Sequence, residues 1–294
     1  MKEIVVLSGK GGAGKTSITA GFAALGARDL VLADCDVDAA DMHLLTAPKV
    51  LVEEDFYSGK TFEVVTDGCV HCFKCMKVCH FDAVRHIDGE FVIDPMECEG
   101  CGYCYRVCPT RTITMHPRPA GKFYVSKTRF GNTLVHARLG IAADNSGKLV
   151  SKVREEAKRK ALEENKDFVL VDASPGIGCP VVASLTGAHY VVMVTEPTVS
   201  GVHDLSRVYE LVEKLKLKSG CIINKADINL EVVSQIKNFL KEKGVALLAE
   251  LPYDTRFTEA ISLGKTIVEY DNGTLRRRIT AAWEKVKAEA TEQG

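Results

Sequence analysis

Residues 6–19 read VLSGKGGAGKTSIT, and this stretch decides the fold. It fits the phosphate-loop pattern, in which small residues let successive backbone N–H groups converge on phosphate oxygens. In this pattern Lys15 reaches the outer phosphates and the Thr16 hydroxyl meets a magnesium ion. An apolar run precedes the loop and an alanine-rich helical stretch follows it, so strand, loop and helix predict a nucleotide site. Its expected binding residues are Gly9, Lys10, Gly11, Gly12, Ala13, Gly14, Lys15, Thr16 and Ser17.

The composition of the 294-residue chain is typical of a folded, soluble protein, with 46% hydrophobic and 26% charged residues. Its net charge of −1 offers no basic excess, so we expect no nucleic-acid partner. No apolar run approaches the roughly 20 residues that span a bilayer, and the chain passes from Met1 almost directly into its first expected strand. We therefore expect a cytoplasmic protein without a membrane span.

Eight of the 11 cysteines lie between residues 69 and 108, in two runs of identical spacing. Each run reads C-x-x-C-x-x-C-x-x-x-C, which is the bacterial ferredoxin spacing, and there the fourth cysteine of each run ligates the other cluster. The pattern predicts two 4Fe-4S clusters. The first would be held by Cys69, Cys72, Cys75 and Cys108, and the second by Cys98, Cys101, Cys104 and Cys79.

Structural zinc is the alternative for these cysteines, because CxxC pairs also bind zinc. Zinc has no use for the third cysteine of each run or for Pro109 after Cys108. One departure from the ferredoxin pattern is His80, which follows Cys79 where proline is usual, and it would alter the local turn and the potential of the second cluster. Two interlocked clusters are the arrangement with which ferredoxins pass single electrons.

Short apolar strands alternate with helical stretches on both sides of the cysteines, which indicates a parallel sheet covered by helices. The expected strands are 30–34, 168–172, 190–195, 220–224 and 246–251, with a hairpin from about Lys122 to Ile141. We predict an α/β protein: a parallel-sheet P-loop NTPase domain, residues 1–62 and 119–294, with an inserted small α+β bacterial-ferredoxin-like domain, residues 63–118. A final amphipathic stretch, 274–291, carries glutamates and is interpreted as a core-packing helix rather than a membrane-surface helix.

Carboxylates follow two of the expected strands. Asp34, Asp36 and Asp38 end the first, and Asp172 ends a strand of four apolar residues. Ligands of open α/β sheets sit at this edge, and an acid there typically holds magnesium through water. A strand-end aspartate can also be a helix cap, but together with the phosphate loop these residues predict one site. Thr16, Asp34, Asp36 and Asp172 are the expected residues around magnesium.

GKGGAGKT, with its additional Lys10, resembles the deviant Walker A ATPases, the group containing MinD, ParA and the nitrogenase iron protein. The stretches DCDVDAADMHLL, DASPGIGCP, TEPTVSGVHDL and INKADI match the MinD-like subfamily with an inserted ferredoxin domain. The resemblance implies that Lys10 crosses a dimer interface to the phosphates bound by the partner subunit. A second cation there would stabilise charge that develops during phosphoryl transfer, much as an arginine finger does.

The resemblance also implies roles for other residues. Lys10, Lys15 and Asp36 would be catalytic, with Asp36 positioning the attacking water and Asp34 nearby; a role for Asp38 stays open. Asn224 and Asp227 belong to an NKxD element, where Asn224 would contact the base. That element also fits GTPases, so ATP is the nucleotide that the family resemblance favours.

Three functions follow as hypotheses. The leading one is an ATP-hydrolysing homodimer, formed on ATP binding, that couples turnover to electron transfer toward an unidentified redox partner. The second is an iron–sulfur cluster carrier of the Mrp type, although the late cysteines Cys179 and Cys221 are not the CxxC pair of those carriers. The third is a MinD- or ParA-like positioning ATPase with a redox-sensing ferredoxin module. A metal role for Cys179 or Cys35 at a dimer interface stays open against simple packing.

Overall fold

The computed structural model describes residues 1–140 and 146–292, and it divides into two compact units. The large unit comprises Met1–Glu54, Lys122–Leu139 and the chain from Ser146 onward, and the cysteine-rich unit is chiefly Asp55–Gly121. The division falls inside two long strands, β3 (Lys49–Val64) and β6 (Ile113–Lys127). The domain boundaries expected from the sequence, 62/63 and 118/119, fall within the same two strands.

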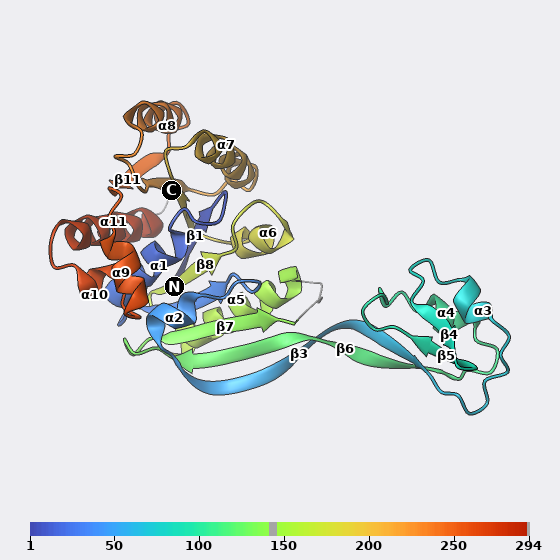
Figure 1. The fold of residues 1–294 in the computed structure, drawn as a ribbon. Helices are drawn as coiled ribbons and strands as arrows, with labels where there is room; N and C mark the ends of the chain where they lie inside the picture. Colours follow the sequence, from blue (N-terminus) through green and yellow to red (C-terminus); the bar gives the residue numbers. More distant parts are fainter. Residues whose placement is uncertain (141–145, 293–294) are drawn as a thin grey trace. The chain divides into compact units, whose positions relative to one another are not determined.

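The large unit is built on a sheet of nine strands in the order β11-β10-β9-β1-β8-β2-β7-β6-β3 (Figure 1). Every pairing from β11 to β7 is parallel, which confirms the predicted parallel α/β sheet. These strands are β1 (Lys2–Ser8), β2 (Leu30–Cys35), β7 (Thr133–Leu139), β8 (Phe168–Ala173), β9 (Tyr190–Thr195), β10 (Ser219–Ile223) and β11 (Ala246–Glu250). β1, β2, β8 and β9 are buried almost throughout, because helices cover both faces of the sheet.

β6 and β7 form the predicted hairpin. The amide of Thr128 donates to the carbonyl oxygen of Asn132 at 2.9 Å and closes the turn between the two strands. The expectation is confirmed as far as Leu139, and Ile141 lies outside the described residues.

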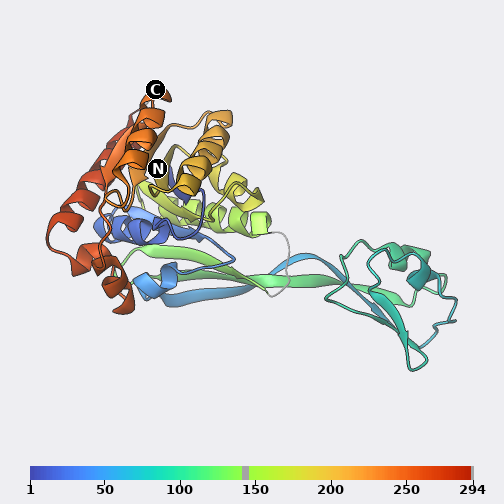
Figure 2. The ribbon, with the colours of Figure 1, turned by 45° about the horizontal axis from the view of Figure 1, so that its top comes forward.

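Three helices pack together on one face of the sheet: α1 (Lys15–Leu25), α10 (Ile267–Tyr270) and α11 (Thr274–Thr291). α1 and α11 lie side by side there (Figures 1 and 2), and Phe22 stacks on Trp283 with ring centroids 5.1 Å apart. Leu275, Ile279 and Trp283 of α11 belong to the main core cluster. The prediction of a core-packing C-terminal helix is therefore confirmed.

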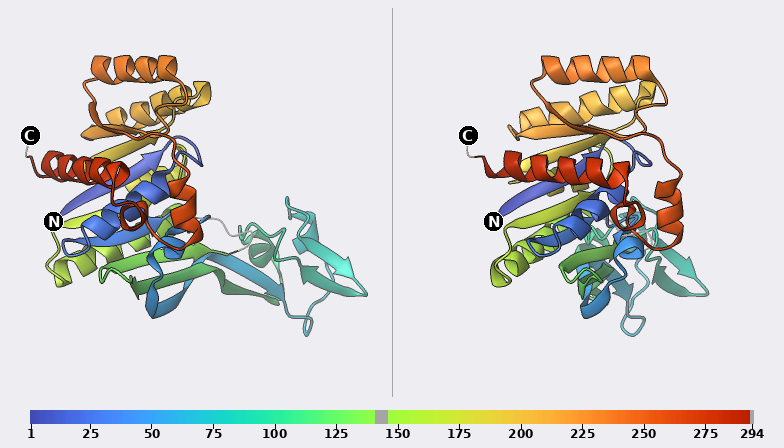
Figure 3. Two further views of the ribbon diagram at one scale, coloured as in Figure 1. Left: turned by 60° about the vertical axis from the view of Figure 1, so that its left-hand side comes forward. Right: turned by 90° about the vertical axis from the view of Figure 1, so that its left-hand side faces the viewer.

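The remaining helices complete the large unit. α5 (Ser146–Glu163) and α6 (Cys179–Leu185) contact each other. α5 also contacts β2, β7 and β8, and α6 contacts β1 and β8. α7 (Val199–Lys214) and α8 (Leu230–Glu242) lie side by side near β9 and β11 (Figure 3). α2 (Met42–Thr46) and α9 (Arg256–Ser262) are short. Within residues 1–140 and 146–292, no helix is long and apolar enough to cross a membrane.

The cysteine-rich unit contains little regular structure. A two-stranded sheet, β4 (Val84–Ile87) and β5 (Glu90–Ile93), accompanies two short helices, α3 (Lys74–Lys77) and α4 (Tyr103–Val107). The two cysteine runs have positive φ at corresponding positions, His71 and Phe73 in the first run and Gly100 and Gly102 in the second. Glycine suits the second run, since a Cβ on Gly100 would lie 2.6 Å from the Lys60 carbonyl oxygen.

Candidate functional site

The phosphate loop joins β1 to α1 and lines a cavity of about 580 Å³ at the carboxyl edge of the parallel sheet. The cavity gathers residues from the loop, from the stretch after β2 and from the stretch after β8. They are Ser8, Gly11, Gly12, Gly14, Lys15, Thr16, Ser17, Asp36, Asp38, Ala39, Asp41, Ser174, Pro175 and Pro180. Five other residues expected at this site do not line the cavity, although each is adjacent in sequence or hydrogen-bonded to a residue that does. They are Gly9, Lys10, Ala13, Asp34 and Asp172.

Gly14 is required where the loop turns into α1. Its φ is +92°, and an added Cβ would lie 2.4 Å from Nδ2 of Asn224. That amide donates to the carbonyl oxygen of Ala13 at 2.9 Å, so Asn224 braces the loop from β10. Asp227 instead accepts a hydrogen bond from the Tyr253 amide, and neither residue lines the cavity. Their predicted part in base recognition stays a prediction.

Asp172 at the end of β8 organises the cationic side of the cavity. Its carboxylate pairs with Lys15 Nζ at 2.9 Å and accepts hydrogen bonds from the Thr16 and Thr19 hydroxyls, both at 2.9 Å. Lys15 also lies 3.5 Å from Asp36. The structure thus brings Lys15, Thr16, Asp36 and Asp172 together, as two separate sequence motifs suggested. Asp34 lies beside them, because its Oδ1 accepts from the Asp36 amide at 3.1 Å.

This cluster holds three carboxylates and one buried ammonium, and their pKa values respond accordingly. Burial alone would lower the pKa of Lys15, but the hydrogen bond to Asp172 and the combined attraction of Asp172, Asp36 and Asp34 outweigh it, and the pKa is raised. Burial, followed by repulsion from Asp172, raises the pKa of Asp34 well above its ordinary value. Burial also raises the pKa of Asp36, against the opposing effect of Lys15. An excess of carboxylate over ammonium is an environment that suits a divalent cation.

Lys10 points to a different set of residues from those that Lys15 contacts. Its ammonium pairs with Glu196 at 2.7 Å and donates to the hydroxyls of Thr198 and Ser200 at 3.3 and 3.0 Å. Glu196 also pairs with Lys225 at 2.7 Å, and although burial opposes it, these lysines lower the pKa of Glu196. Lys10 is therefore held by the start of α7 and not by its own phosphate cavity.

The eight clustered cysteines line two small cavities in the cysteine-rich unit. One cavity is lined by Cys69, Cys72, Cys75 and Cys108, and the other by Cys79, Cys98, Cys101 and Cys104. Each set is the group of four that the ferredoxin spacing assigns to one cluster. His80, which replaces the usual proline, is exposed and lines neither cavity.

The clustered cysteines differ in the acidity of their thiols, also within one cavity. Burial raises the pKa of Cys104 to about 11, and it also raises the pKa of Cys75. Burial acts in the same direction on Cys108, but hydrogen bonds from Thr112 and Thr110, from both side chains and backbone, lower its pKa to about 7. Cys108 is thus prepared to act as a thiolate, the form that binds metal.

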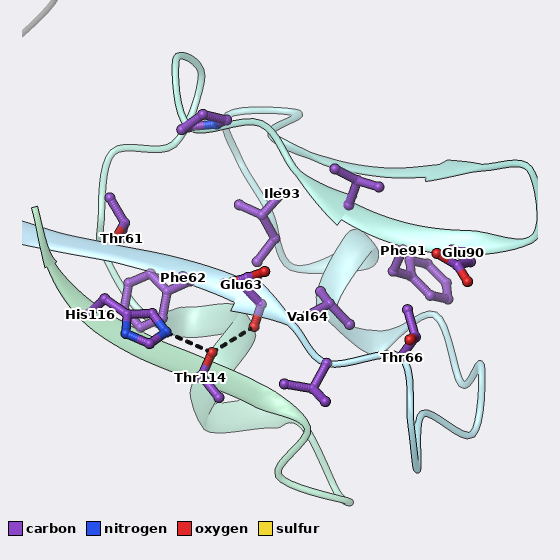
Figure 4. Close-up of a pocket in the computed structure, with 13 residues that line it drawn as sticks. Thr61, Phe62, Glu63, Val64, Thr66, Glu90, Phe91, Ile93, Thr114 and His116 are labelled. Atoms are coloured by element: carbon purple, nitrogen blue, oxygen red, sulfur yellow. Dashed lines mark hydrogen bonds between the residues drawn. The ribbon is translucent and has the colours of Figure 1, made fainter.

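A larger groove of about 1010 Å³ lies elsewhere on the cysteine-rich unit, between β3 and β5. Figure 4 shows Thr114 and His116 of β6 on its floor, where the Thr114 hydroxyl donates to the Glu63 carbonyl oxygen at 3.4 Å. No cysteine lines this groove. Its size therefore does not mark it as a cluster site.

The other three cysteines lie apart from these cavities. Cys35 in β2 and Cys221 in β10 are fully buried, and burial raises the pKa of both. Cys179 is exposed at the first position of α6. The exposed Cys179 and the buried Cys221 therefore do not form the paired thiol site that cluster carriers use. A metal role for Cys179 or Cys35 remains untested.

A family model for the CobQ/CobB/MinD/ParA nucleotide binding domain matches residues 4–267, which include the phosphate loop, the strand-end carboxylates and the cysteine-rich insert. The chain belongs to this family. Its MinD/ParA members are ATPases, so the P-loop and the carboxylates around Lys15 are those of a MinD/ParA-type ATPase domain.

Known proteins resemble both units. An uncharacterized protein of Methanocaldococcus jannaschii, MJ0578, is 32% identical over 229 residues, which cover 77% of this chain and 79% of that protein. An uncharacterized ferredoxin of the same organism, MJ0265, is 34% identical over 70 residues, covering 23% of this chain and 39% of the ferredoxin. The structure of septum site-determining protein MinD from Pyrococcus horikoshii, complexed with Mg-ADP, covers 99% of this chain and 97% of MinD with a TM-score of 0.59 at 22% identity. That likeness shows the MinD fold.

The sequence interpretation missed two residues of the MinD-type site. Thr19 lies one helical turn after Lys15 and holds the second oxygen of Asp172, so i to i+4 spacing from the motif lysine could have identified it. Glu196 follows β9 directly and orders Lys10. It is a third strand-end carboxylate, and the signal that singled out Asp34 and Asp172 applied to it equally.

Proposed function

We propose that this protein binds and hydrolyses ATP as a nucleotide-dependent homodimer and couples turnover to electron transfer through two 4Fe-4S clusters. The proposal rests on one observation. A MinD/ParA-type phosphate loop with its carboxylates and two cavities of four cysteines each are parts of a single chain. Partial similarity to a ferredoxin supports the second half of the proposal.

The nucleotide half begins with an exchange of partners around Asp172. In this structure Lys15 and Thr16 are both held by that carboxylate. On binding Mg-ATP, Lys15 would turn to the outer phosphates and the Thr16 hydroxyl to magnesium, with Asp172 facing the ion through water. The N–H groups of Gly11 to Thr16 would hold the remaining phosphate oxygens, because small residues leave them open to the cavity.

Hydrolysis requires two further groups. Asp36 lines the cavity and would orient the attacking water. Lys15, 3.5 Å away, favours the ionised form of the Asp36 carboxylate. Lys10 is turned toward Glu196 and Thr198, so it would serve the phosphates of a partner subunit rather than its own. Positive charge that arrives only with a partner would tie turnover to dimer formation.

The cysteine half fits an iron–sulfur cluster better than zinc. Among the described residues, no three of the clustered cysteines converge closely enough to hold a single metal ion. Zinc–sulfur bonds of about 2.3 Å would require the thiolates to lie about 3.8 Å apart, whereas a cubane keeps its four ligands further apart at its corners. Bound clusters would supply one-electron carriers, and the chain's residues hold and insulate them.

A second candidate is a positioning ATPase with a redox-sensing module, which the MinD-like fold of the large unit favours. It differs from the leading proposal in one respect: nucleotide state would not alter the clusters' redox behaviour. The apolar face of α11 is packed in the core, so that helix does not offer this face to a membrane.

Metal content tests the cluster assignment directly. Protein prepared without oxygen should contain about eight iron and about eight sulfide per chain. Substituting Cys104 with Ser, in the second set, should lower both counts, whereas Cys221→Ser in β10 should leave them unchanged. Stoichiometric zinc without sulfide would contradict the proposal.

A further inference from the structure

Two threonine hydroxyls surround the sulfur of Cys108, the cysteine that completes the first cavity from the opposite run. Oγ1 of Thr112 lies 3.5 Å from the sulfur and Oγ1 of Thr110 lies 3.6 Å from it. The two hydroxyl oxygens are 3.2 Å apart. The three atoms form a compact hydrogen-bonded triangle at one ligand of the cavity.

The direction of these hydrogen bonds follows from ligation. A cysteine bound to iron is a thiolate and has no proton to donate, so the hydroxyls must be the donors. The two hydroxyls carry one proton each, and the sulfur, as the anionic member of the triangle, is the stronger acceptor. Thr112 is half-buried beside the buried Ile113, whereas Thr110 is exposed. Water can replace the Thr110 hydroxyl more easily than that of Thr112.

We propose that Thr112, assisted by Thr110, raises the reduction potential of the cluster held by Cys69, Cys72, Cys75 and Cys108. Hydrogen bonds to cluster sulfurs are one of the protein's means of setting the potential. Donors stabilise negative charge on the ligand sulfur, and the reduced cluster carries one more negative charge than the oxidised one. The donors therefore stabilise the reduced state more. Thr112 acts through Cys108 and is a positioning residue; the inference rests on the proposed clusters.

The second cavity is arranged differently. None of the hydrogen bonds found in the described residues joins a hydroxyl to Cys79, Cys98, Cys101 or Cys104. The charged residue Glu99 lines this cavity, and the Arg118 guanidinium donates to the Cys98 carbonyl oxygen at 3.4 Å. The effect of Thr112 should therefore be confined to the first cluster, and the two clusters must be followed separately.

The experiment is a redox titration of the full chain, monitored by electron paramagnetic resonance, for Thr112→Val and wild type. Valine keeps the shape of threonine and removes the hydroxyl. We expect the ratio of reduced to oxidised first cluster at a fixed potential to fall about fivefold, which is about 40 mV for a one-electron couple. Thr110→Val should give a smaller shift, and Thr112→Ser, which keeps the hydroxyl, should restore the wild-type potential.

Thr114→Val is the matched control, because Thr114 lies two residues further along the chain, in β6, and its hydroxyl donates to the Glu63 carbonyl oxygen rather than to a sulfur (Figure 4). Its potential should equal that of wild type. An unshifted potential in Thr112→Val at full iron content, or an equal shift in Thr114→Val, would overturn the inference while leaving the proposed function intact. Wild-type protein without iron and sulfide would instead refute the proposed function itself.

Discussion

The two units of this molecule are stabilised by different means. The large unit has an extended core in which strands β1, β2, β8 and β9 pack against α1 and α11. Among the described residues of the cysteine-rich unit, only six are buried together, and five of the six half-buried side chains packed on them are cysteines. A core this small supplies little stability without cross-links or metal. We infer that apolar packing stabilises the large unit, whereas the proposed clusters would stabilise the cysteine-rich unit.

The comparison is tested most severely by removing the clusters. Anaerobic chelation of iron should raise hydrogen exchange throughout residues 66–112 to rates near those of unfolded chain, because metal binding supplies the folding free energy. Exchange in β1, β8 and β9 should remain slow, since their core cluster contains none of the eight clustered cysteines. Mass spectrometry of peptides from both units provides the measurement and its internal control. Slow exchange in the cysteine-rich unit after iron is lost would contradict the comparison.

The large unit lines its nucleotide cavity by itself, but we propose that it hydrolyses ATP only in a dimer, so a change at Lys10 should affect turnover and not binding. Lys10→Ala should retain nucleotide affinity while turnover falls at least about 100-fold and nucleotide-dependent dimerisation is lost. Lys15→Ala should lose binding itself, because Lys15 faces the cavity. ATPase assays, calorimetry and sedimentation measure the three quantities, with the exposed Lys214→Ala as the control. Wild-type turnover in Lys10→Ala would refute a role in trans.

In the large unit, we expect the buried Asp34 carboxylate to lower the free energy of unfolding. Because burial raises its pKa, the native state binds the Asp34 proton more tightly than the unfolded chain does. Its contribution to the free energy of unfolding therefore falls as pH rises above the ordinary aspartate pKa. Asp34→Asn keeps the acceptor for the Asp36 amide and removes the charge, so at pH 7.5 unfolding should cost about 1–3 kcal/mol more.

Denaturant unfolding of the nucleotide-free protein measures this gain. It should shrink as pH is lowered toward 5, where the wild-type carboxyl is protonated at less cost. The exposed Asp38→Asn provides the control and should show no such gain. A gain that is independent of pH would show that charge at Asp34 is not the cause.

Much of the large unit was predictable because its strands are short apolar runs between motifs. β8 and β9 were expected within one residue of their observed ends, since each is buried on both faces. The length of β3 was not expected. Most of its 16 residues are exposed, including Val50, Leu51 and Val52, so hydrophobic alternation does not mark it.

The site was predictable where a motif carries it and unpredictable where contacts between distant segments decide. Lys15, Thr16 and the two sets of cysteines follow from spacing alone. That Lys10 rests on Glu196, 186 residues further along the chain, follows only from the packing of β9 beside β1. Thr112 lies four residues after Cys108, but this spacing does not predict that the Thr112 hydroxyl lies beside the Cys108 sulfur.

Nucleotide state in the large unit should alter the redox behaviour of the clusters in the other unit. A redox titration of the wild-type protein with no nucleotide, with Mg-ADP and with Mg-ATP measures this effect. Asp36→Ala should serve as an ATP-bound trap and extend the last state. We expect Mg-ATP to shift the potential of at least one cluster, or its rate of oxidation by an external acceptor, and Lys15→Ala to abolish the shift. Identical potentials and oxidation rates in all three states, at full iron and nucleotide occupancy, would contradict this expectation.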